Sequence, residues 1–128
     1  AISRLLADLA GQMVRVQESA DEEAVHDLRV ATRRLGEGLR LFAGNLPDGA
    51  GKRVRREIRE LRQRAAAVRD RDVTLGLLRR KQLQAGDPAY AYLRGQRDLA
   101  AEELRAFVHR RLQKRRPERW AERLGVEL

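Results

Sequence analysis

The amino-acid sequence predicts an all-α fold, an antiparallel bundle of about four long helices followed by a short C-terminal helix. Apolar residues recur at three- and four-residue steps along most of the chain, which is the repeat of one face of an α-helix. No stretch alternates apolar and polar residues as a half-buried strand does. The connecting segments are short, and short connections favour antiparallel packing of successive helices. The 128 residues are expected to form one domain, residues 1–128.

The first two helices are expected from their apolar faces and a capping residue. The first runs from Ile2 to about Ser19, with a core stripe of Leu5, Leu6, Leu9, Met13 and Val16. Asp21 is the expected N-cap of the second helix, and Glu22 and Glu23 follow in its first turn, where the helix dipole favours negative charge. This helix should continue to about residue 42. Its core stripe consists of Leu28, Thr32, Leu35, Leu39 and Phe42.

A glycine-rich segment, residues 44–51, separates the second helix from a long third one. The third helix is expected to span Lys52 to about Gln84, with Gly76 as its one weak point. Its core stripe consists of Val54, Ile58, Leu61, Ala65, Val68 and Leu75.

The last two helices are expected from proline and glycine positions. Asp87 and Pro88 suit the N-cap and first turn of a fourth helix, which should continue to about Arg116. Pro117 then opens a short helix that ends at Gly125.

The composition is strongly basic. The chain has 28 Lys+Arg against 19 Asp+Glu, a formal net charge of +9 at pH 7. Three of the 28 are lysines, so 25 are arginines, whose planar guanidinium groups can grip two phosphate oxygens at once. The codon bias of a GC-rich genome would also favour arginine. Since 42% of the residues are hydrophobic, we expect a folded domain despite the high charge.

Several classes of function are disfavoured by what the sequence lacks. Without cysteine there is no disulfide, thiolate metal site or thiol nucleophile, which fits a cytoplasmic localisation. No apolar run approaches the ~20 residues that span a bilayer, so no membrane association is expected. Aromatic residues make up only 4% of the chain, which argues against a surface that stacks nucleic-acid bases.

The positive charges fall on particular helix faces. Since a helix turns roughly 100° per residue, His26, Arg29, Arg33 and Arg40 should share one side of the second helix. The third helix should carry a matching row of Lys52, Arg55, Arg59, Arg62 and Arg69, with Arg80 near its far end. Glu57 and Glu60 lie on another face, and Glu37 flanks the row of the second helix.

These rows of like charge suggest a bound polyanion. Like charges four residues apart destabilise a helix by about 0.2–0.5 kcal/mol per pair, and a polyanion would relieve that repulsion. The alternative is a solvated surface on which a charge of +9 has to cluster somewhere.

Two segments resemble the sequence motifs of CHAD domains, the conserved histidine α-helical domains. VHDLRVATRRL (residues 25–35), with LRLF (39–42), is similar to the first motif, and AVRDRDV (67–73) is similar to the second. The resemblance implies a helical bundle of two similar halves around a basic pore, with inorganic polyphosphate as ligand and association with polyphosphate granules. It assigns pore-lining roles to His26, Arg29, Arg33, Arg34, Arg59 and Arg69.

The chain departs from the family pattern in two respects. The family usually has a basic residue where this chain has Gly36, and Gly38 follows within the same helix, so either the helix is weakened or another segment approaches closely. The chain also resembles only the first half of a typical member. Because a half-length member can rebuild two halves by pairing with a copy of itself, we expect a homodimer, with Val30 and Leu41 suited to the interface.

The sequence therefore predicts non-catalytic polyphosphate binding, with no cofactor, no metal site and no catalytic residue. Nucleic-acid binding through the same surface is the alternative, although no helix-turn-helix or zinc-finger spacing supports it. An enzyme acting on phosphates would need grouped carboxylates or a glycine-rich phosphate loop. Asp70 and Asp72 point apart on a helix and are expected to be ion-pair partners of nearby arginines or helix-packing contacts.

Overall fold

The computed structural model describes residues 1–82 and 86–128 and confirms the all-α fold, with no strand in these ranges. The elements are α1 (Ile2–Glu18), α2 (Glu22–Leu41), the 3-10 turn η1 (Ala43–Asn45), α3 (Ala50–Arg80), α4 (Pro88–Gln113) and α5 (Arg116–Leu124).

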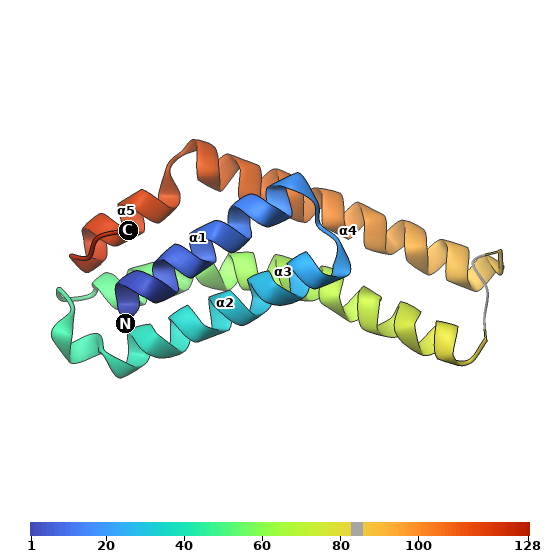
Figure 1. Cartoon of the computed structure of the whole chain (residues 1–128), viewed down its shortest axis with the longest axis horizontal. Helices are drawn as coiled ribbons and strands as arrows, with labels where there is room; N and C mark the ends of the chain where they lie inside the picture. The colour runs from blue at the N-terminus through green and yellow to red at the C-terminus, as the bar shows by residue number, and fades with distance from the viewer. Residues whose placement is uncertain (83–85) are drawn as a thin grey trace.

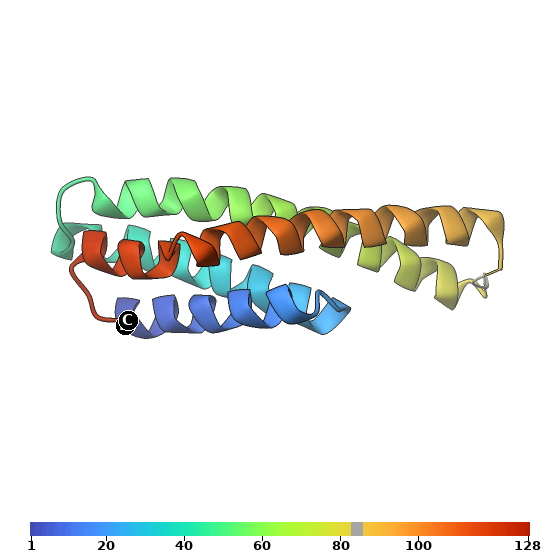
Figure 2. The same ribbon diagram turned by 90° about the horizontal axis from the view of Figure 1, so that it is seen from above.

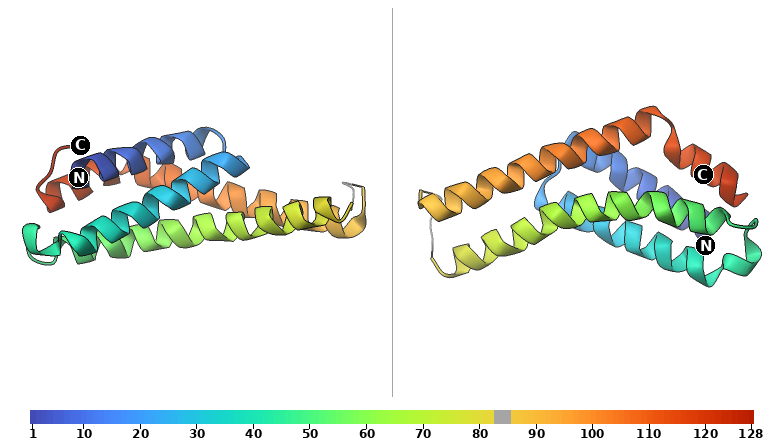
Figure 3. Two further views of the ribbon diagram at one scale, coloured as in Figure 1. Left: turned by 60° about the horizontal axis from the view of Figure 1, so that its bottom comes forward. Right: turned by 180° about the vertical axis from the view of Figure 1, so that it is seen from behind.

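The four long helices form a closed antiparallel bundle. Each of them packs against the next along the chain, and α4 returns to pack against α1 (Figures 1 and 2). The C-terminal end of α3 and the N-terminal end of α4 lie beside each other and extend beyond α1 and α2 (Figure 1). The two chain ends lie side by side at the opposite end of the bundle, where the Ser3 hydroxyl donates to the Glu127 carbonyl (Figure 3).

The expected start of α2 is confirmed, and the ends of α3 differ from expectation. The Asp21 carboxylate accepts a hydrogen bond from the backbone N–H of Ala24 at 2.8 Å, as an N-cap does. α3 begins at Ala50, within the segment expected to be a loop, and runs through Gly76 without interruption. It ends at residue 80, whereas its expected end, Gln84, lies outside the described residues.

The boundary between α4 and α5 was predicted three residues too late. α4 ends at Gln113, because Arg115 adopts a left-handed conformation with φ 53° that cannot continue a helix. α5 starts at Arg116 with Pro117 in its first turn. Gly125 caps α5 with φ 69°, a conformation that glycine adopts without strain.

The core lies between the four long helices and follows the predicted stripes, with two exceptions. Phe42 was expected in the core but is 38% exposed, because α2 ends one residue before it. Leu5 is only partly buried and packs against the rim of the core. The two largest fully buried side chains are Trp120 and Phe107, which the sequence stripes did not include.

Two buried polar contacts tie distant segments to this core. The Arg97 guanidinium on α4 donates to the Asp72 carboxylate on α3 at 2.8 Å and to the Ala20 carbonyl at 2.6 Å. At the other end, the indole N–H of Trp120 donates to the Glu57 carboxylate at 2.9 Å and thereby holds α5 against α3. Among the described residues, none of the helices is long and apolar enough to cross a bilayer.

Candidate functional site

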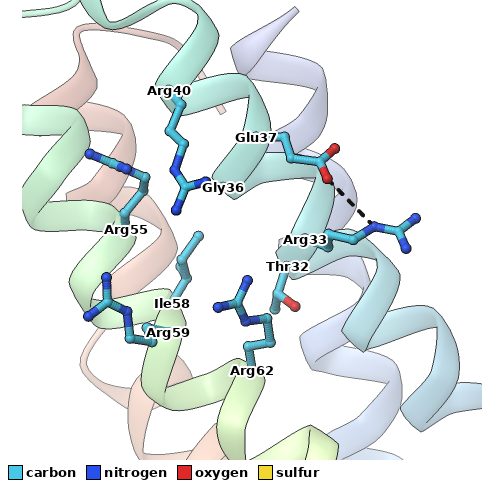
Figure 4. A pocket seen from close by; sticks show the side chains of 9 residues that line it. All are labelled: Thr32, Arg33, Gly36, Glu37, Arg40, Arg55, Ile58, Arg59 and Arg62. Carbon is cyan, nitrogen blue, oxygen red and sulfur yellow. Dashed lines mark ion pairs between the residues drawn. The ribbon is translucent and has the colours of Figure 1, made fainter.

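A cavity of about 120 Å³ opens on the bundle surface between α2 and α3. Five of the residues that line it are arginines, and they come from both helices. The full lining is Thr32, Arg33, Gly36, Glu37, Arg40, Arg55, Ile58, Arg59 and Arg62 (Figure 4). We call it the α2–α3 cavity.

Helical spacing explains why these arginines meet. Arg33 and Arg40 are seven residues apart, about two turns, so both lie on the side of α2 that adjoins α3. Arg55, Arg59 and Arg62 follow at steps of four and three on α3, so they form a matching row. The antiparallel packing of α2 on α3 then places the two rows on opposite walls.

The floor of the cavity is uncharged. Ile58 and Thr32 are 3% and 1% exposed, and Gly36 lies beside them without a side chain. Figure 4 shows Arg40 and Arg62 reaching toward the middle of this floor from opposite ends. Because the floor carries no charge, the guanidinium groups of the walls give the cavity a positive charge that attracts anions.

Four of the five arginines have no counterion in the part of the chain that the structure describes. Arg40, Arg55, Arg59 and Arg62 form no ion pair there, whereas Arg33 turns aside to Glu37 at 3.9 Å (Figure 4). The Arg55 Nε is also buried without a hydrogen-bond partner. A buried donor without a partner costs about 1–3 kcal/mol, so an anion that accepts from it would remove that cost.

Many arginines elsewhere in the molecule are paired. Arg15 contacts the Asp27 carboxylate at 2.6 Å, a hydrogen bond that raises the pKa of Arg15 above its ordinary value. Arg111 and Arg64 both lie over the ring of Phe107 and near Glu60. Other arginines, such as Arg110 and Arg119, also form no ion pair with the described residues, so what distinguishes the α2–α3 cavity is that four such arginines from two helices line one cavity.

Five of the ten residues predicted to bind the polyanion lie outside the cavity lining. His26 and Arg29 continue the row of α2 toward its N-terminus and are exposed. Arg69 continues the row of α3 but forms an ion pair with Glu22 at 3.7 Å. The other two, Lys52 and Arg34, are also exposed.

A comparison with models of protein families identifies the family to which the chain belongs. The model of the CHAD domain matches residues 1–128, the whole chain. The chain belongs to the CHAD family. Polyphosphate binding is associated with this family. Comparisons with curated proteins and with solved structures found no match.

In this CHAD domain the two unusual glycines of α2 serve different purposes. A Cβ at Gly38 would lie 2.8 Å from Leu5 Cδ1 and 3.3 Å from Ile2 Cδ1, so Gly38 allows α1 to pack closely on α2. A Cβ at Gly36 would meet only Ile58 Cδ1, at 4.0 Å. The absence of a side chain at Gly36 therefore leaves the floor of the α2–α3 cavity open instead of serving helix packing.

The aspartates of the second CHAD motif behave as structural residues. Asp72 is buried and forms an ion pair as expected, but its partner is Arg97 on another helix and not an arginine nearby in sequence. For Asp70 the expected ion pair is not found among the described residues. Asp70 is exposed on the far side of the same helix. No group of three or more potential metal ligands is found in residues 1–82 or 86–128.

Sequence reasoning missed three residues of the cavity as site residues. Thr32 and Ile58 were assigned only to the core, yet they also form the cavity floor. Gly36 was noted as a departure from the CHAD pattern, without a place in the site. The signal was available, since each of the three lies within four residues of a predicted site arginine and beside it on the helix surface.

Proposed function

We propose that this CHAD domain binds inorganic polyphosphate at the α2–α3 cavity and along the adjoining helix rows. One observation carries the proposal: Arg40, Arg55, Arg59 and Arg62 line one cavity without a carboxylate partner among the residues that the structure describes. The association of the family with polyphosphate agrees with it.

The chemistry of a phosphate chain fits these walls. Each guanidinium group presents several N–H donors in a plane and can hold two phosphate oxygens. A hydrogen bond to a charged group contributes about 1.5–3 kcal/mol. The buried Nε–H of Arg55 can donate such a bond to a phosphate oxygen. A bound phosphate chain would leave the cavity along His26 and Arg29 in one direction and along Lys52 in the other, since these cations continue the arginine rows of α2 and α3.

We propose binding without catalysis. Among the described residues, Glu37 is the one carboxylate in the cavity lining, and it is paired with Arg33. A phosphate-transfer site needs a metal or a base aligned with the reacting phosphorus. The cavity offers donors that neutralise charge but offers no group placed to activate water.

Competition between polyanions tests the proposed function. Labelled polyphosphate would be bound to the protein and displaced by polyphosphate, single-stranded DNA or duplex DNA at equal phosphate concentration and equal salt. We expect polyphosphate to displace the label at the lowest concentration, because its charges are closely spaced and it carries no bases to accommodate. Displacement by either DNA at equal or lower concentration would replace the proposal with nucleic-acid binding.

We further propose that two copies of the chain associate through the face of α2 that carries Val30 and Leu41, beside its basic face. Leu41 is 81% exposed at the end of this helix, and Val30 is half-buried on the same helix. Pairing would bring two α2–α3 cavities into one assembly, in the cytoplasm and on polyphosphate granules. Light scattering coupled to gel filtration is expected to give twice the 14.7 kDa chain mass. A monomer mass at every concentration, with and without polyphosphate, would contradict the dimer.

A further inference from the structure

The row of cations on α2 ends in a carboxylate. Counting back from Arg33, the same face of the helix carries Arg29, then His26, then Glu22, at steps of four, three and four residues. Glu22 thus takes the position at which the row would have its next cation.

The Glu22 carboxylate is held by two arginines from α3. One oxygen lies 3.7 Å from Arg69 Nη1, and the other lies 4.0 Å from Arg79 Nη2. Arg79 is itself fixed by a hydrogen bond to the Tyr90 hydroxyl at 3.0 Å, which raises the pKa of Arg79 above its ordinary value. Two guanidinium groups ten residues apart on α3 therefore converge on one internal anion.

We infer that Glu22 is an internal competitor that closes one end of the polyanion site and sets the length of chain the protein can hold. Its carboxylate occupies Arg69, which continues the cation row of α3 and which a longer phosphate chain would otherwise contact, and it also lies near Arg79. A phosphate chain that reaches this end of the two helix rows meets a like charge at Glu22 and has to displace it. This inference rests on the proposed function and assigns a specificity-determining residue to the same site.

Glu22 is too far from the α2–α3 cavity to change phosphate binding there through its charge alone. Glu22 is eleven residues from Arg33 along α2, about 16 Å at 1.5 Å per residue. The Debye length at physiological salt is about 8 Å, so the Glu22 charge is largely screened at the α2–α3 cavity. A short phosphate chain that fills only the α2–α3 cavity should therefore bind independently of Glu22, whereas a phosphate chain that extends along the helix rows should be affected by it.

The test compares Glu22→Gln with Glu23→Gln in the full chain. Both changes remove one negative charge from the first turn of α2, and both break an ion pair with an arginine, since Glu23 contacts Arg15 at 3.8 Å. Only Glu22 lies on the row. We expect Glu22→Gln to bind long-chain polyphosphate about three- to tenfold more tightly than Glu23→Gln does, because the Arg69 guanidinium group is released to the ligand and the like charge on the row is removed. Tripolyphosphate should bind the two variants equally.

A third variant tests whether Arg69 is responsible for the increase in polyphosphate affinity. Adding Arg69→Ala to Glu22→Gln should remove most of the increase, because Arg69 is the released contact that lies on the row. Equal affinity of the two glutamine variants for long chains would overturn the inference, as would a gain that persists without Arg69 or that also appears with tripolyphosphate. Absence of polyphosphate binding by the unmodified chain would instead overturn the proposed function, and this inference with it.

Discussion

Replacing Arg59 and Arg62 together by alanine is expected to weaken polyphosphate binding about 100-fold at physiological salt. Each arginine contributes a charge-assisted hydrogen bond of about 1.5–3 kcal/mol, and each 1.4 kcal/mol is a tenfold change in affinity. The slope of log affinity against log salt should also fall by about 1.4, since each lost phosphate contact removes about 0.7 for a single chain. Both side chains are exposed and unpaired, so their loss should leave the fold intact.

The matched control removes the same charge from another face. Arg110 and Arg119 are exposed and form no ion pair within the described ranges, but they lie on α4 and α5, away from the α2–α3 cavity. Their double alanine variant should bind polyphosphate within about threefold of the unmodified chain, as screened surface charges contribute little. Equal losses in the two double variants, measured by fluorescence anisotropy, would show that net charge alone drives binding.

Replacing Asp72 by alanine is expected to lower the free energy of unfolding by about 3–5 kcal/mol. The side chains of Asp72 and Arg97 are 7% and 11% exposed, so the change leaves a guanidinium group buried without its counterion. Arg97 also donates to the Ala20 carbonyl, so the connection between α1 and α2 is affected as well. Urea unfolding followed by circular dichroism measures the loss.

Asp70 provides the control for this prediction. It lies two residues away on the same helix, is exposed, and should change stability by less than about 0.5 kcal/mol when replaced by alanine. Replacing Asp72 and Arg97 together by leucine and methionine should recover most of the stability, because no unpaired charge then remains buried. Equal stability of the Asp70 and Asp72 variants would refute a structural role for the ion pair.

The arginines of the cavity could be grouped from the sequence, because residue spacing determines which side chains share a helix face. Arg33 and Arg40 on one helix, and Arg55, Arg59 and Arg62 on the next, could be placed on common sides by counting residues. The short connection between these helices made antiparallel contact the expected arrangement. The two rows therefore face one cavity for reasons that are local in the sequence.

Choices of partner between distant segments could not be predicted in this way. Asp72 pairs with Arg97, twenty-five residues away and on another helix, although Arg69 and Arg71 are much nearer in sequence. Glu22 was assigned to the helix dipole alone, yet it also meets Arg69 once the bundle has formed. Such pairings depend on how far one helix slides along the next, which residue periodicity does not determine.

Helix ends were also poorly determined by pattern. α4 stops at Gln113 because Arg115 takes a left-handed conformation, although no glycine marks that position. Phe42 fits the apolar period of α2 but lies past the end of the helix, where nothing covers it completely. In both cases backbone geometry at a single residue overrides a periodic signal that is otherwise correct.

The most direct measurement is a structure of the chain with polyphosphate bound. We predict phosphate groups between α2 and α3, with an oxygen within hydrogen-bond distance of Arg55 Nε, the buried donor that has no partner among the described residues. Arg40 and Arg62 should close on the same phosphate chain from opposite ends of the cavity. Polyphosphate bound on α4 and α5 instead, with the Arg55 Nε still without an acceptor, would contradict it.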